Sequence, residues 1–249
     1  MYLPQFVSIL SRVDSTGREP LPSFSGVDDS SCSSRFLSFL GQAQMPAFSF
    51  VSADMTALIA RVDAYARAVL SPPRYEHSRR VAEFGCMLVR RYALEAQLEP
   101  HVYCAGIAHD MCREHSEVFL LRAAACDGFP IDVTERGTPL LLHGRAAACV
   151  LAQEFGVQDE VLLSAVRWHT FGCEDFGVLG KILFISDKIE PARAWAASLR
   201  GAVSTLTLDA LAAKVVSASI VCAERKRTTP HPRTCAMLRA LGKDVSQPA

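Results

Sequence analysis

The feature that most constrains the fold is a succession of apolar helical patterns that runs from about Ser52 almost to the end of the chain. In the first pattern Leu58, Val62 and Tyr65 recur at helical spacing, between an N-cap serine and a Ser-Pro-Pro stop. Comparable helical stretches are expected at 74–96, 99–112, 115–128, 143–156, 159–170, 177–189 and 208–227.

One stretch allows two interpretations. Residues 181–186, KILFIS, form a short continuous apolar run, which period alone cannot assign to a helix or to a strand. No segment of alternating polarity is present to pair with it, and the sequence contains neither an internal repeat nor a glycine-rich phosphate loop. The chain is therefore predicted to be an all-α helical bundle.

Composition narrows the class of protein. Half of the 249 residues are hydrophobic, which is enough for a large core. Lys plus Arg and Asp plus Glu number 26 each, so no overall basic charge recruits a nucleic acid polymer. The nine cysteines contain no C-x-x-C pair, and no apolar run reaches the roughly 18 residues of a membrane span. We therefore expect a cytoplasmic protein with no membrane partner.

The helical patterns are not spread over the whole chain. Residues 14–34 are rich in Ser, Gly, Pro and Asp and show no periodicity. We expect an N-terminal arm of low order over 1–51, one helical domain over 52–242 and a tail over 243–249.

Histidines and aspartates recur at or near the ends of the apolar helical stretches. A side chain of this kind at one helix end needs no function, but several on successive helices indicate a metal site in the bundle core. These residues are His77, His109, Asp110, His143, His169 and Asp187.

Four of these residues make a plausible first ligand set. His109 and Asp110 are adjacent on one helix and can lean toward the same ion, and His77 and Asp187 complete a set of imidazoles and carboxylates. Nitrogen and oxygen ligands suit a divalent ion such as iron, manganese, cobalt or zinc, and we expect iron. Two carboxylates also balance the +2 charge, so metal loading is expected to stabilise the fold.

The residues around these ligands carry a resemblance. The succession H…HD…H…H…D resembles the HD-domain metal-dependent phosphohydrolases, with HDMCR at 109–113 and SDKIEPAR at 186–193. The words RYEH, LLHG, RWHTFG and RTTPHPRTCAML are similar to the YqeK family of symmetrical bis(5'-nucleosyl)-tetraphosphatases. Two departures stand beside this resemblance: Arg113 replaces a Lys, and Ala147 replaces a Gly.

The resemblance implies a reaction and a set of roles. The family hydrolyses diadenosine tetraphosphate to two ADP at a site with one or two ions. Asp110 is then catalytic as well as a ligand, and we interpret His143 and His169 as catalytic groups that contact phosphate and transfer protons, with a second metal site as the alternative. Substrate contacts are assigned to Arg74, Arg193, His143, His169, Thr170 and Gly172.

Other interpretations keep the fold. The same ligands could serve hydrolysis of a nucleoside monophosphate, a deoxynucleoside triphosphate or an alarmone, or a non-catalytic module that senses nucleotides. The oligomeric state is open, with a homodimer as one option. Glu190 is expected to fix the turn after Asp187, and Trp168 is expected in the core. His101, His115 and His231 are predicted to be ordinary surface residues.

Overall fold

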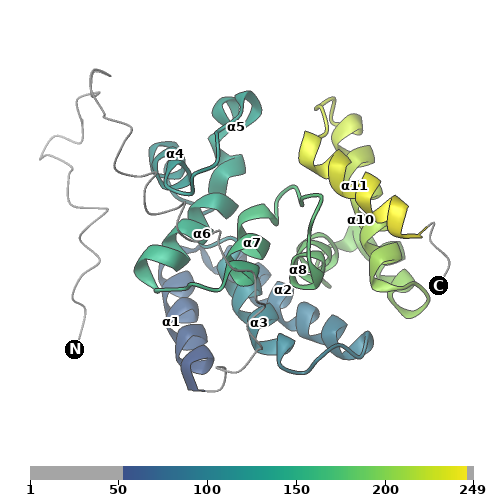
Figure 1. Cartoon of the computed structure of the whole chain (residues 1–249), viewed down its shortest axis with the longest axis horizontal. Helices are drawn as coiled ribbons and strands as arrows, with labels where there is room; N and C mark the ends of the chain where they lie inside the picture. The colour runs from purple at the N-terminus through teal and green to yellow at the C-terminus, as the bar shows by residue number, and fades with distance from the viewer. Residues whose placement is uncertain (1–52, 246–249) are drawn as a thin grey trace, which may run out of the picture. The chain divides into compact units, whose positions relative to one another are not determined.

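The computed structural model describes residues 53–245, so the predicted arm and the N-cap Ser52 lie outside the described residues. Eleven α-helices make up the described part (Figure 1). They are α1 Ala53–Val69, α2 Pro72–Arg91, α3 Leu98–Ala108, α4 Glu117–Ala125, α5 Val133–Gly137, α6 His143–Glu154, α7 Glu160–Trp168, α8 Val178–Ile189, α9 Ala197–Gly201, α10 Leu208–Arg225 and α11 Pro232–Val245. Short 3-10 turns lie at Pro139–Leu142, Ala194–Ala196 and Ala202–Ser204.

The all-α prediction is confirmed, since residues 53–245 contain no strand. The ambiguous run 181–186 lies inside α8, which packs against α2, α3, α7 and α10. Residues 182–185 are all buried, which explains why this run shows no amphipathic period. At the other end of the chain, α11 continues to Val245, into the segment predicted as a tail.

Helices α2 and α3 pack closely because two glycines line their contact. A Cβ on Gly106 would lie 2.4 Å from the Cα of Ala82, and one on Gly85 would lie 2.5 Å from a methyl group of Val102. Any side chain at Gly106 would push the two backbones apart. The close approach sets the separation of the two helices that carry His77 and His109.

Helix α6 is fixed to the preceding loop by a buried arginine. Arg145 donates to Asp127 Oδ1 and Oδ2 at 2.7 and 2.8 Å and to Glu135 Oε2 at 2.9 Å. Its remaining contacts are backbone carbonyls of Ala124, Phe129 and Pro130. Because this network is 2–4% exposed, every donor of the guanidinium needs a partner, and the contacts supply them.

The structure corrects two predictions about surface residues. His101 is 6% exposed and His231 is 8% exposed, so both are buried. His101 lies 3.5 Å from Asp159, the N-cap of α7, and His231 lies 3.0 Å from Asp132, the N-cap of α5. Both histidines begin or precede helices in sequence, where a surface position is common, but tertiary pairing buries them here. Trp168 is buried, as predicted.

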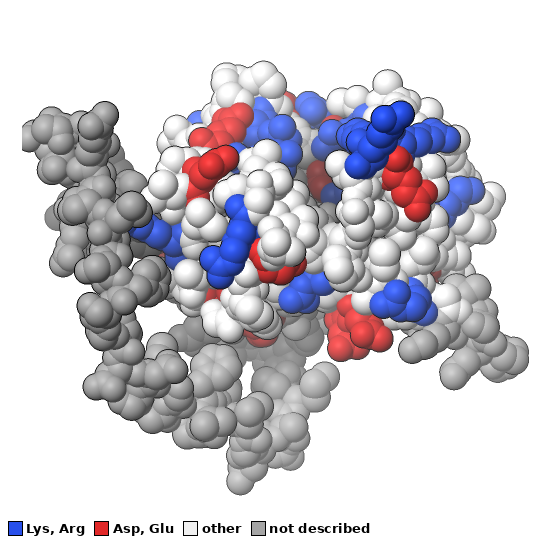
Figure 2. Space-filling model, turned by 90° about the horizontal axis from the view of Figure 1, so that it is seen from above, with Lys and Arg blue, Asp and Glu red and all other residues white. Residues whose placement is uncertain are grey.

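The surface is mixed in charge. Figure 2 shows Lys and Arg side chains interspersed with Asp and Glu over the face seen from above. This agrees with the formal net charge of zero. None of the described helices is both long enough and apolar enough to cross a membrane.

Candidate metal centre

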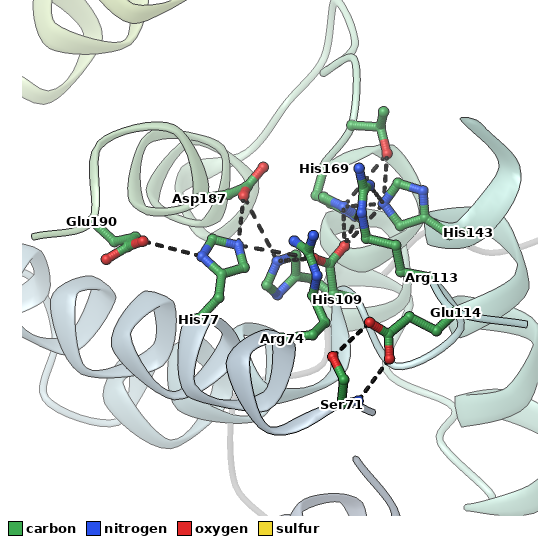
Figure 3. A network of polar contacts seen from close by, with 12 residues as sticks. Ser71, Arg74, His77, His109, Arg113, Glu114, His143, His169, Asp187 and Glu190 are labelled. Carbon is green, nitrogen blue, oxygen red and sulfur yellow. Dashed lines mark hydrogen bonds and ion pairs between the residues drawn. The ribbon is translucent and has the colours of Figure 1, made fainter. Parts of the chain in front are cut away.

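Helix ends bring the six predicted residues to one buried place (Figure 3). Each is at most 8% exposed. His77 lies in the second turn of α2, His109 directly follows α3, Asp110 lies in the next turn, His143 begins α6, His169 directly follows α7, and Asp187 lies in the last turn of α8. Five helices therefore contribute to one cluster, in the manner of metal sites in helix bundles.

The first part of the cluster is formed by His77, His109 and Asp187, whose ligand atoms lie within 4.8 Å of one another. His77 Nδ1 is 3.2 Å from Glu190 Oε1, and its Nε2 is 3.1 Å from Asp187 Oδ1. A carboxylate accepts hydrogen bonds only, so Nδ1 carries the proton toward Glu190. Nε2 then needs a proton or a metal ion between it and Asp187.

His109 gives the clearest sign of a metal site. Its Nδ1–H donates to the carbonyl of Gly106 at 2.7 Å, which leaves a lone pair on Nε2. That Nε2 is fully buried and has no hydrogen-bond partner among the described residues. Burial also lowers the pKa of the imidazole, which favours the neutral form that binds metal. The residues present therefore fit a divalent ion.

The second part of the cluster is built around His143 and His169. Their Nδ1–H groups donate to the carbonyls of Leu140 and Val166 at 2.6 and 2.8 Å. Both Nε2 atoms are therefore acceptors, although they lie only 3.0 Å apart. Asp110 Oδ1 adds a third acceptor, 3.1 Å from His143 Nε2.

Few hydrogen-bond donors lie near these three acceptor atoms. Arg113 donates to His143 Nε2 at 3.2 Å, and Thr170 Oγ1 lies 3.5 Å from the Nε2 atoms of both His143 and His169. The ligand atoms of His109, Asp110 and His169 also lie within 4.8 Å of one another. A cation near these atoms would remove the repulsion between their lone pairs.

Asp110 lies between the two parts. Its Oδ2 accepts from Arg74 Nη1 at 3.0 Å and is 3.6 Å from His109 Nε2, while its Oδ1 faces His143. Burial acts to raise the pKa of this carboxyl, but the imidazoles of His109 and His143, once protonated at acid pH, outweigh burial and hold the pKa well below its usual range. Asp110 is thus a carboxylate with one oxygen toward each part of the cluster.

Asp187 is held as a carboxylate in the same way. Burial acts to raise its pKa, but the Lys188 ammonium and the hydrogen bond with His77 keep the pKa well below its usual range. Arg193 also contacts this group, with Nη2 3.4 Å from Asp187 Oδ1 and 3.4 Å from His77 Nε2.

Half-buried arginines line the cluster where it opens to solvent. The side chains of Arg74, Arg113 and Arg193 are 30, 32 and 36% exposed. Each contacts a residue of the cluster and also reaches solvent. A guanidinium offers phosphate two parallel donors, which suits such a position.

Glycine 172 has a packing role that the sequence did not indicate. Its N–H donates to the carbonyl of Trp168 at 2.6 Å, its φ is +71°, and a Cβ there would lie 2.2 Å from Met237 Sδ. Glycine meets both the positive φ and the lack of space. The amide of Gly172 is already used in the hydrogen bond that ends α7. Substrate binding by Gly172 stays a prediction.

Glu190 is a supporting residue whose full role sequence reasoning missed. Its Oε2 accepts from Ala192 N at 2.7 Å, which confirms that it fixes the turn after α8, and from Arg80 Nε at 2.8 Å. Its other oxygen faces His77 Nδ1 and so orients that ring. The acidic residue in the word IEP indicated only the turn, because the contact with α2 spans more than a hundred residues of sequence.

Comparison with known proteins relates the residues of this cluster to a protein family. The HD domain family matches residues 74–192, a segment that contains all six residues of the cluster. The chain contains an HD domain over residues 74–192. This confirms the resemblance noted from the sequence.

Curated relatives are found at about 30% identity. Two are named symmetrical bis(5'-nucleosyl)-tetraphosphatases: one from Staphylococcus aureus is 32% identical over 128 residues, and one from Bacillus subtilis is 29% identical over 126 residues. Each match covers 51% of this chain, and 64% and 66% of the two relatives. The similarity thus spans just under two thirds of these relatives' own length.

A solved structure shares the fold of this protein. The protein from Clostridium acetobutylicum, described as a predicted HD superfamily hydrolase involved in NAD metabolism, superposes with a TM-score of 0.67 at 24% identity. The superposition covers 74% of this chain and 97% of that chain. At this identity the match establishes the fold alone.

Proposed function

We propose that this chain is a metal-dependent phosphohydrolase that cleaves diadenosine tetraphosphate symmetrically into two ADP in the cytoplasm. The observation that carries the metal dependence is the buried, unpartnered Nε2 of His109, which faces two carboxylates. The names of the relatives and the flanking words at 109–113, 167–172 and 186–193 support the choice of substrate.

The proposed ligands are His77, His109, Asp110 and Asp187, and the expected ion is iron, with manganese, cobalt or zinc as alternatives. A divalent ion bound there supplies a Lewis acid for a phosphoryl oxygen and lowers the pKa of water. Glu190 keeps the His77 ring in place, and the Gly106 carbonyl keeps the proton of His109 on Nδ1.

His143 and His169 have two candidate roles. Phosphate contact with proton transfer is the role expected from the sequence. The second role, as ligands of a second ion with Asp110 Oδ1, is favoured by one specific observation, the 3.0 Å approach of two Nε2 atoms whose Nδ1 protons are both committed. We therefore propose that His143, His169 and Asp110 would hold a second ion.

The arginines around the cluster are the proposed substrate clamp. Arg74 and Arg193 would bind the phosphate chain so that an inner phosphorus faces the centre, and their charge would stabilise the departing ADP. Arg113 adds a third guanidinium beside His143. Thr170 Oγ1, near both Nε2 atoms of the second part, would donate to a phosphate oxygen.

The test uses the full chain, loaded with iron or manganese, in a single turnover of diadenosine tetraphosphate in heavy-oxygen water. The expected products are two ADP, with one solvent oxygen in only one of them. ATP plus AMP would contradict symmetrical cleavage.

Two other outcomes would replace the proposal. Turnover of a nucleoside monophosphate, a deoxynucleoside triphosphate or a guanosine polyphosphate, without turnover of the tetraphosphate, would reassign the substrate. Metal and nucleotide binding without any hydrolysis would favour a sensing module. The His115→Ala variant, changed outside the cluster, is the control for handling and folding.

A further inference from the structure

The N-terminal turn of α11 contacts the segment that follows His169. Thr234 Oγ1 donates to the carbonyl of Phe171 at 2.9 Å, and the ring of His231 stacks on Phe171 with a centroid separation of 3.8 Å and an interplanar angle of 12°. The guanidinium of Arg233 lies 3.9 Å from the centre of the Trp168 ring. Helix α11, which packs beside α10 (Figure 1), thus touches residues on both sides of His169.

Gly172 lets this helix come close. Because Gly172 has no Cβ, the Met237 side chain of α11 packs directly against the backbone of the loop after α7. The residues of the contact, His231, Thr234 and Met237, are each at most 8% exposed. The contact is therefore a packed junction.

His231 also reaches the segment that leads to His143. The backbone N–H of Arg233 donates to Nδ1 of His231 at 3.2 Å, so the ring carries its proton on Nε2 and donates it to Asp132 Oδ2 at 3.0 Å. Asp132 caps α5 through a reciprocal capping box with Glu135. From α5 the chain passes through the turn Pro139–Leu142 directly into His143.

We propose that His231 and Thr234 are positioning residues for the pair His143 and His169. They lie outside residues 74–192, the segment that matches the HD domain family, and touch neither ion ligands nor the space between them. Their contacts fix two chain segments, one on each side of the pair, whose Nε2 atoms must stay about 3 Å apart to act on one ion or one phosphate. Such supporting contacts determine ligand placement in metal sites. The metal readout below rests on the metal-binding role proposed above, while the tautomer readout does not.

The experiment compares two nearly isosteric changes at one position. Thr234→Val removes the hydrogen bond to Phe171 and keeps the shape, whereas Thr234→Ser keeps the hydroxyl. In the metal-free full chain, the ring nitrogen resonances of His169 should report one tautomer, with the proton on Nδ1, in the wild type and in Thr234→Ser. In Thr234→Val and His231→Ala they should broaden or shift toward a mixture of tautomers.

Cobalt titration followed by visible absorption is the second readout. His231→Ala should weaken the binding of the second cobalt equivalent severalfold, less than the roughly tenfold or more that removal of a direct partner of a ligand causes, because His231 acts through Asp132 and Phe171. The matched control is His101→Ala, because His101 is also a buried histidine beside an N-cap aspartate, Asp159, but at the opposite end of α7. It should lower the melting temperature and leave both readouts at their wild-type values.

Two outcomes would overturn the proposal, and a third would separate it from the proposed function. His169 resonances that are the same in Thr234→Val and Thr234→Ser would show that the hydrogen bond positions nothing. Equal effects of His101→Ala and His231→Ala on the His169 tautomer would show that general loosening of α7 is responsible. If the wild type hydrolyses no nucleotide but the His169 tautomer still follows Thr234, the positioning role stands and the proposed function fails.

Discussion

Two buried polar clusters of this protein differ in the balance between hydrogen-bond donors and acceptors. Around Arg145, the donors of one guanidinium meet the carboxylates of Asp127 and Glu135 and three backbone carbonyls. Around His109, imidazole lone pairs face carboxylate oxygens and other lone pairs. The first cluster is complete as it stands, and the second is complete only with cations.

This difference distinguishes a cluster that stabilises the fold from a cluster that is suited to bind a cation. A buried network with donors and acceptors in balance stabilises one arrangement of the chain, and removing one member leaves uncompensated charge. A buried cluster with an excess of acceptors costs stability unless it binds something positive. The protein retains the second cluster, and the binding of a cation explains why.

The largest expected effect is on the unbalanced cluster. The His109→Ala variant should lose hydrolysis to background and bind less metal per chain, because His109 contributes a ligand atom to both three-residue groups. Its metal-free form should unfold at a somewhat lower urea concentration than the wild type, because the hydrogen bond of Nδ1 to Gly106 and the packing of a buried ring are lost. Activity assays, metal mass spectrometry and urea denaturation measure the three quantities. Full metal occupancy in this variant would remove His109 from the ligands.

Arg145 should show the opposite behaviour. Arg145→Met leaves Asp127 and Glu135 buried without their partner, which should lower the free energy of unfolding by about 3–5 kcal/mol. At temperatures where the variant is folded, it should lose far less metal per chain than His109→Ala, because Arg145 contributes no ligand atom. The triple variant with Asp127→Asn and Glu135→Gln should recover part of the loss. An unchanged denaturation midpoint for Arg145→Met would refute the structural role.

The next largest effect is the pH dependence of the stability of the metal-free protein. Burial lowers the pKa of His109 and His169 below the ordinary value of 6.5, so the unfolded chain takes up protons there before the folded chain does. Stability should therefore be complete above about pH 6.5 and fall as the pH drops below it, with Asp110 and Asp187, whose pKa values lie below 3.8, still ionised.

Urea midpoints at pH 7.5 and 5.5 would measure this dependence, and His109→Gln should weaken it. His115, whose pKa burial also lowers, contributes alike to both proteins, so the difference isolates His109. A midpoint that rises toward acid pH would contradict the expected sign.

The smallest effect should be at the rim of the cluster. Arg193→Ala should raise KM for the tetraphosphate about tenfold, because one charge-assisted contact is lost, with a smaller change in kcat. Arg193→Lys should recover part of the affinity, since the charge remains but the two parallel donors do not. Arg136→Ala, at an exposed arginine of α5, is the control. Equal KM values for Arg193→Ala and wild type would exclude Arg193 from the substrate clamp.

Sequence reasoning predicted the cluster around His109 but missed the cluster around Arg145. Residues such as His77 and Asp187 stand out at the ends of apolar helical stretches, so their chemistry can be seen without the fold. Arg145 follows His143 inside an ordinary helical pattern, and its partners Asp127 and Glu135 lie in a loop and a short helix whose placement depends on tertiary packing. The same reason explains the error over His231, since Phe171 and Asp132 are distant in sequence from it.

Anomalous X-ray diffraction from crystals of the full chain grown with manganese tests the central claim most directly, that the excess of acceptors in this cluster holds divalent cations. We predict an anomalous peak about 2.0–2.2 Å from His109 Nε2 and an oxygen of Asp187, and a second peak beside His169 and Asp110. One peak beside His109 alone would keep the metal centre and return His143 and His169 to phosphate contact. Crystals with no peak at the cluster, and with the Nε2 atoms of His143 and His169 still about 3 Å apart, would contradict the claim.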